Sequence, residues 1–260
     1  MRVLVTNDDG IDSAGLRALA RVAVAAGHDV VVAAPASEAS GASASLQAVD
    51  VDGRVIVEAR ALPDLAGVPA HAVAATPAFI VLLATRSAFG PPPELVLSGI
   101  NLGANTGAAV LYSGTVGAAL AGLANGCRAM AVSLDVGLEV RGERRERRWD
   151  TAAAVATKLL PLVTGAERGF VLNVNVPNRA RSELRGVRRA RLATFGVVQM
   201  TMLEQGTGWV KMSLQPNDAD LEPGTDEALL VEGYATATPI RASQEAEDVV
   251  LSGLADEVRR

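Results

Sequence analysis

Two adjacent carboxylates, Asp8 and Asp9, are the residues whose types and spacing point most directly to chemistry. They follow a short apolar run at residues 3–6, a pattern that indicates a buried strand leaving its sheet. Neighbouring carboxylates repel each other, and a hard cation such as Mg²⁺ or Mn²⁺ relieves the repulsion by accepting oxygen ligands. The same residues, with Asn7 and Gly10, would also make an ordinary tight turn or helix cap. The pair alone leaves both interpretations open.

Two neutral side chains, Ser40 and Asn101, follow other apolar runs at comparable positions. Open α/β sheets bind ligands at the carboxyl ends of their strands, so loops after different strands can converge on one crevice. Hydroxyl and amide oxygens complete an oxygen-rich metal shell without adding negative charge. For each residue alone, an ordinary loop hydrogen bond is the favoured alternative. Convergence of the three loops is therefore what a metal site here requires.

The stretch Tyr-Ser-Gly-Thr-Val-Gly at residues 112–117 comes just before a predicted helix. Its backbone N–H groups, with the hydroxyls of Ser113 and Thr115, could hold phosphate oxygens at the positive end of the helix dipole. The alternative is a simple Ser/Thr cap. Neither a dinucleotide-binding glycine motif nor a P-loop motif occurs, which disfavours a dehydrogenase or a P-loop enzyme. The two histidines, His28 and His71, lie where structural roles are more common, so a phosphohistidine mechanism has little support.

The elements that must position these residues alternate between strand and helix patterns. Apolar runs predict strands, and spacing of i, i+3, i+4 predicts helices between them. The order indicates an α/β fold, with a Rossmann-like, doubly wound, mostly parallel sheet over residues 1–180. Strand-like pieces then indicate a β-rich extension over residues 181–260, for oligomerisation and partial cover of the site. The expected strands are 3–6, 29–34, 95–98, 130–134 and 171–176, the expected helices 13–27, 76–90, 117–124 and 149–160, the hairpin 49–57, and the later strands 187–193, 209–214 and 234–240.

Composition limits the classes of function. The chain has 260 residues, a net charge of -5 and a pI of about 5.2, so bulk electrostatics do not favour nucleic acid or an anionic membrane as partners. Cys127 is the only cysteine, which excludes an intrachain disulfide and favours a reducing cytoplasm. The first residues show neither a signal-peptide nor a membrane-anchor pattern, so we expect a cytoplasmic protein. The arginine-rich segment 141–148 is better explained as a solvated loop than as a phosphate-binding patch.

Several separated motifs, in order, resemble the SurE family of survival-protein nucleotidases. They are Val-Thr-Asn-Asp-Asp-Gly-Ile at residues 5–11, Ala-Pro at 34–35 with Ser40 and Gly41, Ser-Gly-Ile-Asn-Leu-Gly-Ala-Asn at 98–105, Tyr-Ser-Gly-Thr-Val-Gly-Ala-Ala at 112–119, Leu-Asn-Val-Asn-Val-Pro at 172–177, Gly-Thr-Asp at 224–226 and Gly-Tyr-Ala-Thr-Ala-Thr-Pro-Ile at 233–240. The resemblance spans most of the chain. It implies a Rossmann-like core and a C-terminal extension that helps form a homodimer or homotetramer.

The resemblance also implies an activity and a ligand set. The activity is that of a 5'-nucleotidase, a metal-dependent phosphomonoesterase that hydrolyses nucleoside monophosphates to nucleoside and phosphate. The implied cofactor is a divalent metal, Mg²⁺ or Mn²⁺. The implied metal ligands are Asp8, Asp9, Ser40 and Asn101, the expected catalytic residues are Asp8, Asp9 and Asn101, and the expected phosphate-binding residues are Asn101, Asn105, Ser113, Gly114 and Thr115.

Several positions depart from the family pattern. Ala109 and Ala121 stand where the family usually has acidic residues, Ala75-Thr-Pro-Ala-Phe79-Ile80 stands in place of Gly-Thr-Pro-Ala-Asp-Cys, and Ala36 replaces a loop aspartate. We expect the changes at Ala109 and Ala121 to remove negative charge near the site. A non-catalytic nucleotide- or phosphate-binding relative is therefore the main alternative, and a sugar-phosphate or polyphosphate phosphatase is a third reading.

Overall fold

A mostly parallel sheet of nine strands forms the centre of the molecule in the computed structural model, which describes residues 1–137, 146–167, 169–194, 198–216 and 221–241. Six of its strand pairs are parallel, and only β9–β13 and β5–β6 are antiparallel. The expected α/β class is confirmed. In sheet order the strands are β10 (Val187–Arg189), β13 (Ala235–Ile240), β9 (Val171–Pro177), β8 (Arg128–Asp135), β7 (Leu95–Leu102), β1 (Arg2–Thr6), β2 (Asp29–Pro35), β6 (Ala70–Val73) and β5 (Val57–Arg60).

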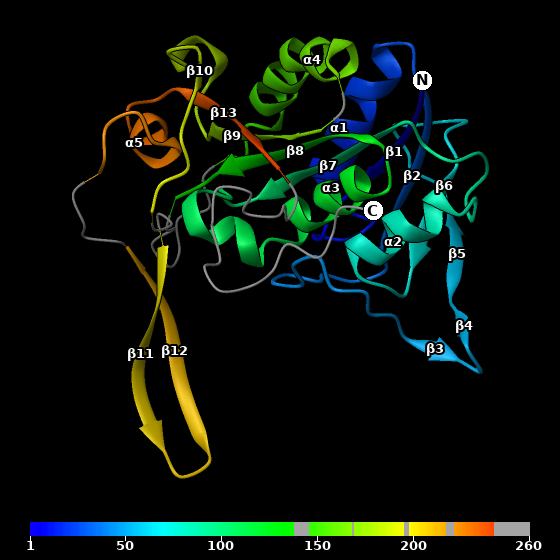
Figure 1. The fold of residues 1–260 in the computed structure, drawn as a ribbon, viewed down its shortest axis with the longest axis horizontal. Helices are drawn as coiled ribbons and strands as arrows, with labels where there is room; N and C mark the ends of the chain where they lie inside the picture. Colours follow the sequence, from blue (N-terminus) through cyan, green and yellow to red (C-terminus); the bar gives the residue numbers. More distant parts are fainter. Residues whose placement is uncertain (138–145, 168, 195–197, 217–220, 242–260) are drawn as a thin grey trace, which may run out of the picture.

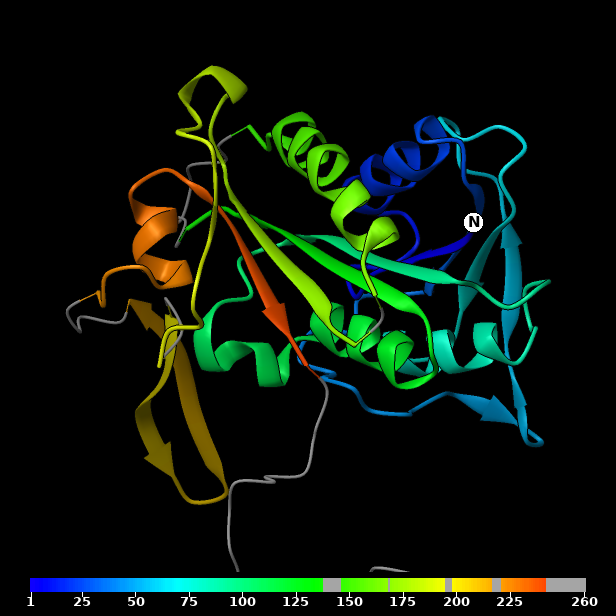
Figure 2. The ribbon, with the colours of Figure 1, turned by 45° about the horizontal axis from the view of Figure 1, so that its top comes forward.

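Helices cover both faces of this sheet, which explains why its central strands are continuous apolar runs rather than alternating ones. One face carries α1 (Ala14–Ala25) and α4 (Trp149–Gly165), and the other carries α2 (Pro77–Thr85) and α3 (Gly114–Ala124) (Figures 1 and 2). Two large hydrophobic clusters fill the two layers between sheet and helices. The central strands are therefore packed on both faces, and their carboxyl ends carry the candidate site.

Helices α1, α2 and α4 start where the sequence pattern predicts, whereas α3 starts at Gly114 rather than at residue 117, and two helices end elsewhere than expected. Ser13 caps α1, where its Oγ accepts a hydrogen bond from the N–H of Leu16 at 3.1 Å. Helix α2 ends at Thr85 rather than near residue 90, because Ser87 adopts a left-handed conformation with φ 67°. Helix α4 continues to Gly165 past the expected end at residue 160, because Val163 is still buried against the core despite the proline at position 161.

The residues after 180 contribute to the main sheet as well as to an extension. Strands β10 and β13 pair with each other, and β13 pairs with β9, whereas β11 (Val198–Gly206) and β12 (Trp209–Pro216) form a separate hairpin. This hairpin projects away from the body (Figure 1). The short helices η2 (Arg181–Glu183) and α5 (Asp226–Val231) complete this part. The sequence pattern had predicted β12 and β13, a longer β10, and no strand at β11; the division at residue 180 stays a prediction.

Two smaller expectations can also be compared with the structure. Strands β3 (Asp50–Val51) and β4 (Arg54–Val55) form the hairpin expected around Asp52 and Gly53. The arginine-rich segment falls mostly outside the described residues; within them, Arg148 forms an ion pair with Glu146 at 2.9 Å.

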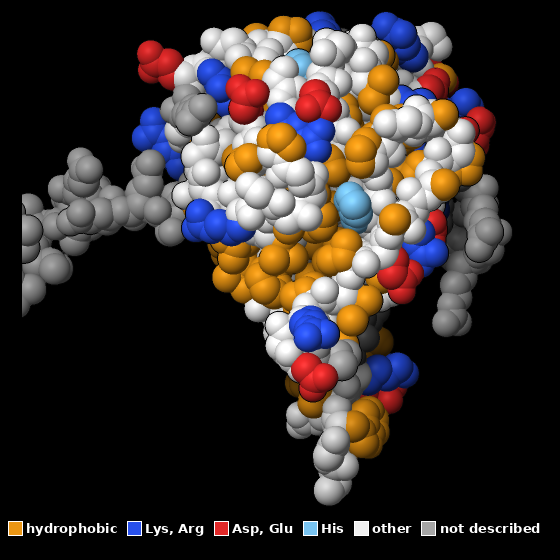
Figure 3. Space-filling model, turned by 90° about the vertical axis from the view of Figure 1, so that its right-hand side faces the viewer, with side chains coloured by type: hydrophobic (Ala, Val, Ile, Leu, Met, Phe, Trp, Pro, Cys, Tyr) orange, Lys and Arg blue, Asp and Glu red, His pale blue; other side chains and the backbone are white. Residues whose placement is uncertain are grey.

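Along the described chain, no helix has the length and apolar character needed to cross a bilayer. Hydrophobic side chains gather on part of the face seen at the right of Figure 1 (Figure 3).

Candidate metal and phosphate site

A cavity of about 340 Å³ opens at the carboxyl ends of β1, β2 and β7. The sheet order explains its position, since β1 lies between β2 and β7 and Thr6 pairs with Ser98. The loops after these strands therefore meet at one edge, as the sequence argument required. The residues that line the cavity include six predicted from the sequence, Asp8, Asp9, Ser40, Asn101, Asn105 and Ser113, together with Glu38, Gly41, Leu102, Ala109 and Tyr112.

Asp8 is a buried carboxylate locked onto the first turn of α3. Its Oδ1 accepts a hydrogen bond from the hydroxyl of Thr115, and its Oδ2 accepts one from the Thr115 backbone N–H at 3.2 Å. Gly114 makes this approach possible, because a Cβ at that position would lie only 2.7 Å from Asp8 Oδ2. Both hydrogen-bond donors of Thr115 thus point at Asp8.

Asp9 is more open than Asp8 and less fully hydrogen-bonded. Its Oδ2 accepts a hydrogen bond from the Leu102 N–H at 3.2 Å, and no hydrogen bond to its Oδ1 occurs among the described residues. Burial, and then the charge of Asp8, raise the pKa of Asp9 to about 6. Burial also raises the pKa of Asp8. Two negative charges held together in a desolvated site are unfavourable, and a bound cation would offset that cost.

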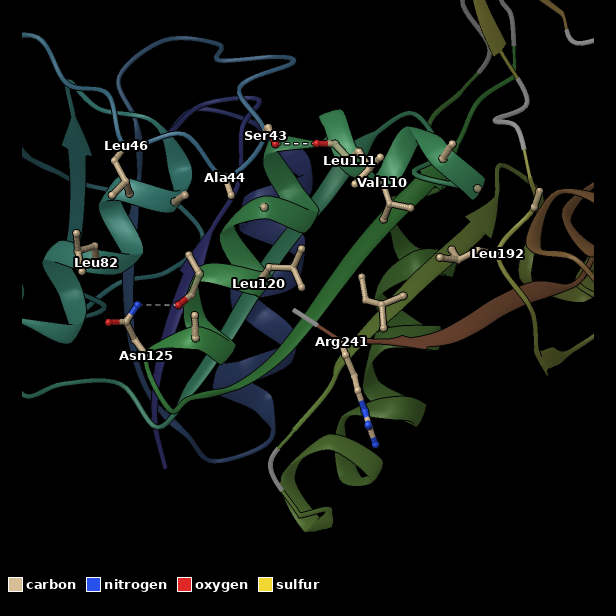
Figure 4. Close-up of a pocket in the computed structure, with 18 residues that line it drawn as sticks. Ser43, Ala44, Leu46, Leu82, Val110, Leu111, Leu120, Asn125, Leu192 and Arg241 are labelled. Atoms are coloured by element: carbon tan, nitrogen blue, oxygen red, sulfur yellow. Dashed lines mark hydrogen bonds between the residues drawn. The ribbon is translucent and has the colours of Figure 1, made fainter. Parts of the chain in front are cut away.

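The loop that carries Ser40 is tied down at both ends. The Ala39 N–H donates to the Asp8 carbonyl oxygen at 2.8 Å, and Ser43 Oγ donates to the Leu111 carbonyl oxygen at 2.7 Å (Figure 4). The Ser40 hydroxyl itself donates to Glu38 Oε1 at 2.5 Å. Glu38 was missed by the sequence argument, although an acidic residue in a loop already expected to cover the site was the available signal.

Asn101 lies at the end of β7 with its amide oriented by a local contact. Its Nδ2 donates to the Gly103 carbonyl oxygen at 2.7 Å, whereas its Oδ1 accepts no hydrogen bond among the described residues. Just before it, Gly99 passes so close to β8 that a Cβ would lie 2.2 Å from the Val132 carbonyl oxygen. The strand can reach the cavity edge in this way only with glycine at position 99.

Asn105 is held by a buried polar network beneath the cavity. Its N–H donates to Asn175 Oδ1 at 2.7 Å and its Nδ2 donates to Ser133 Oγ at 2.8 Å. Its carbonyl oxygen accepts from Nδ2 of Asn173 at 2.8 Å and of Asn175 at 3.0 Å. Asn173 and Asn175 alternate along β9 and so share one face of the sheet. The sequence argument quoted this Asn-Val-Asn motif but gave it no role.

Ser113 caps α3, because its Oγ accepts a hydrogen bond from the Val116 N–H at 3.0 Å. Its hydroxyl hydrogen remains available to a ligand in the cavity that Ser113 lines. Ser113 can therefore cap α3 through its oxygen and still donate its hydroxyl hydrogen to a phosphate. Neither histidine lines this cavity; His71 stacks on Phe89 with ring centroids 5.1 Å apart.

The donor set suits a hard cation. Among the residues with described placement, no cluster of three or more His, Cys, Asp or Glu side chains could hold a metal. The candidate ligands are instead two carboxylates with a hydroxyl and an amide oxygen, all on the wall of one cavity. An all-oxygen set of this kind matches Mg²⁺ or Mn²⁺ better than zinc, whose protein sites nearly always include nitrogen or sulfur ligands.

Two of the family departures, Ala109 and Ala121, line different cavities. Ala109 lines the site cavity, as expected. Ala121 does not: it lines a larger apolar cavity of about 720 Å³ between α2, α3 and residues near Leu192 and Ile240 (Figure 4). The expectation that Ala121 lies near the site is corrected, because position 121 is two turns along α3 from Ser113, roughly 12 Å at 1.5 Å per residue.

Comparisons with known proteins give a consistent result. The family described as "Survival protein SurE" matches residues 3–198. The chain is 36% identical to a 5'-nucleotidase SurE of Nitratidesulfovibrio vulgaris over 93% of each chain. It is also 36% identical to a 5'/3'-nucleotidase SurE of Shigella dysenteriae, over 96% of this chain and 95% of that protein. The crystal structure of the SurE protein from Aquifex aeolicus superposes with a TM-score of 0.77 and 27% identity, over 96% of both chains.

Proposed function

The chain belongs to the survival-protein SurE family, and we propose that it is a metal-dependent phosphomonoesterase that hydrolyses nucleoside monophosphates to nucleoside and phosphate. The names of its relatives, 5'-nucleotidase and 5'/3'-nucleotidase, support this reaction. The observation that carries the proposal is the cavity itself, which joins two carboxylates, two neutral oxygen donors and the start of α3.

A bound cation would allow this acidic cavity to accept an anionic substrate. Asp8, Asp9 and the nearby Glu38 would repel a phosphate ester unless positive charge lies between them. We propose that Asp8, Asp9, Ser40 and Asn101 hold one divalent metal, Mg²⁺ or Mn²⁺. When bound, such a metal polarises a phosphoryl oxygen and lowers the pKa of a water molecule.

The remaining chemistry is assigned to the side chains of the chain. Asp9 is the better proton acceptor for the attacking water, because Asp8 already accepts two hydrogen bonds from Thr115 whereas Asp9 Oδ1 accepts none in the described part of the chain. Asn101 and Asn105, with the Ser113 hydroxyl and the Gly114 N–H, are proposed to hold phosphate. Thr115 is proposed to fix Asp8, since both its donors face that carboxylate; its predicted contact with phosphate stays a prediction.

One observation favours a second candidate function. Ala109 removes an acidic side chain from the cavity wall relative to the family pattern, and a relative that binds nucleotide without turnover would keep all other groups in place. A phosphatase of sugar phosphates or polyphosphate would use the same groups on another substrate.

Assembly and location complete the proposal. We infer a homodimer or homotetramer in which the extension over residues 181–260 takes part and partly covers the site. The projecting β11–β12 hairpin supports this, because Met202, Leu203, Trp209 and Val210 are exposed on it. A cytoplasmic location is proposed from the single, buried Cys127.

A phosphate-release panel tests the function. The full chain, stripped of metal with EDTA, is assayed on 5'-AMP, 5'-GMP, 3'-AMP, ribose 5-phosphate and polyphosphate, without metal and with Mg²⁺ or Mn²⁺ restored. We expect turnover of the nucleotides only with metal. Activity that persists after complete chelation contradicts the metal assignment. Metal-dependent AMP binding by calorimetry without turnover supports the binding alternative, and preference for the non-nucleotide esters supports the third reading.

A further inference from the structure

The buried acid Asp226 lies outside the candidate cavity yet contacts a segment that enters it. We propose that Asp226 is a positioning residue, which acts by holding residues 105–107 and thereby the side chain of Asn105. This inference rests on the proposed function, because Asn105 is one of the proposed phosphate ligands. The Gly-Thr-Asp motif that ends at Asp226 had been noted in the sequence without a physical role.

Asp226 connects three stretches of backbone. It is fully buried, and its Oδ2 accepts a hydrogen bond from the Gly107 N–H at 3.0 Å. Its Oδ1 accepts from the N–H groups of Ala193 at 2.9 Å and Glu227 at 3.1 Å. Gly107 and Asp226 are 119 residues apart in the chain, so this contact is a tertiary clamp and not a local cap.

The clamp holds one side of a segment whose other side is held by the sheet. Asn173 and Asn175 on β9 fix the backbone of Asn105, as described above. Thr106, between the two anchors, is buried. Without Asp226 as acceptor, the buried Gly107 N–H would lose its partner and the segment would be held from the sheet side alone.

The backbone of Asp226 also links this segment to the C-terminal extension. The Asp226 N–H donates to the Arg191 carbonyl oxygen at 2.8 Å, and the Arg191 N–H donates to the Gly224 carbonyl oxygen at 3.1 Å. Residues 191–193 and residues 105–107 are therefore both hydrogen-bonded to the start of α5. Asp226 does not line the cavity, and in the described part of the chain its carboxylate accepts hydrogen bonds only from Gly107, Ala193 and Glu227, which is why its role is positioning rather than catalytic.

Asp226→Asn tests the proposal, because the amide keeps the shape but replaces one acceptor atom by a donor. We expect kcat/KM for 5'-AMP to fall between about 10- and 100-fold, the range that a misplaced positioning group costs. Hydrogen exchange should become faster at the amides of residues 105–107. The Glu222→Gln variant is the control: Glu222 is a neighbouring, exposed acid paired with Arg191, and its change should leave both readouts at the wild-type level.

A double-mutant cycle with Asn105→Ala separates positioning from a purely structural role. If Asp226 acts through Asn105, the double variant loses no more kcat/KM than Asn105→Ala alone. Losses that multiply, or unchanged kcat/KM in Asp226→Asn despite faster exchange, overturn the proposal. Should Asp226→Asn not fold, Asp226→Glu takes its place in the same cycle.

Failure of the proposed function gives a different result. A wild-type chain without turnover on any ester contradicts the phosphatase assignment alone. The same cycle, measured as AMP affinity by calorimetry together with amide exchange, then decides the role of Asp226 by the same criterion.

Discussion

Two pairs of adjacent acids, Asp8 with Asp9 and Asp226 with Glu227, sit in largely buried surroundings and differ in where their oxygen atoms face. The first pair lines an open cavity beside Ser40 and Asn101. The second pair lines neither of the cavities described above, and the oxygens of Asp226 accept hydrogen bonds from three backbone N–H groups. One pair is thus arranged to receive a ligand and the other to join segments of chain. Adjacent acids in a sequence predict neither role until their donors are known.

The same two causes raise the pKa of one acid in each pair. Burial first, and the neighbouring acid second, raise the pKa of Asp9 to about 6 and that of Glu227 to about 7. A cation can relieve the first pair because the cavity admits one. In the second pair, the buried Oε1 of Glu227 has no hydrogen-bond partner among the described residues. Protonation of Glu227 would remove the unfavourable buried charge.

The largest effect should come from removing one charge from Asp8 and Asp9, here called the cavity pair. We expect Asp9→Asn to lower kcat for 5'-AMP by roughly 10³-fold or more, because it removes both a proposed metal ligand and the proposed proton acceptor. Metal affinity, measured by calorimetry, should fall as well. The free energy of unfolding should not decrease, since the change removes an unfavourable charge from a desolvated site.

Asp12→Asn is the matched control, because Asp12 is an exposed acid three residues away. It should leave kcat and metal affinity unchanged. Wild-type turnover in Asp9→Asn would remove the cavity pair from the mechanism and leave the two acid pairs functionally alike.

A second change tests whether the cavity pair depends on its fit to α3. In Gly114→Ala the new Cβ would lie 2.7 Å from Asp8 Oδ2 and 2.9 Å from Asp8 Cβ. The carboxylate must move away from Thr115, and we expect kcat/KM to fall about 10- to 100-fold, as for other displaced catalytic groups. Steady-state kinetics on 5'-AMP measures this loss.

The control for that variant is Gly165→Ala. Gly165 is also a helical glycine, but a Cβ there would lie within 4 Å of no atom in the described part of the chain. Its activity should equal that of the wild type. Equal activity in Gly114→Ala would show that the contact between Asp8 and α3 is not needed for turnover.

The sequence identified most of the first region and little of the second. The ends of strands, and the glycines and oxygen-bearing side chains that follow them, can be recognised from short stretches of sequence. These local patterns predicted the crevice around Asp8, Asp9, Ser40 and Asn101. The contact between Asp226 and Gly107 spans 119 residues and leaves no local pattern. It depends on β13 turning antiparallel beside β9, which brings α5 against the site segment.

Side-chain partners were harder to predict than positions. A hydroxyl at the start of a helix led us to expect that Thr115 binds phosphate, which stays a prediction; the sequence did not show that both donors of Thr115 meet Asp8. Ala121 was expected near the site, but the helix carries it to the apolar cavity. Sequence spacing places a residue on an element; only packing decides which neighbour its atoms face.

The smallest expected effect concerns the stability of the second pair. The pKa of Glu227 is about 7 in the folded chain against an ordinary 4.5, so between these values the folded state holds a proton that the unfolded state has released. The free energy of unfolding should therefore fall as pH rises from about 4.5 to 7, and Glu227 should cause no further change above pH 7.

Glu227→Gln cannot ionise, so its Tm should exceed that of the wild type at pH 8 by a few degrees, at about 2–4 °C per kcal/mol. Thermal unfolding at pH 4.5, 6 and 8 measures the difference, with Glu232→Gln, an exposed acid on the same short segment, as the control without such a trend. Parallel Tm curves for wild type and Glu227→Gln would mean that Glu227 is charged at no cost in the folded chain, and the contrast with the cavity pair would then lie in geometry alone.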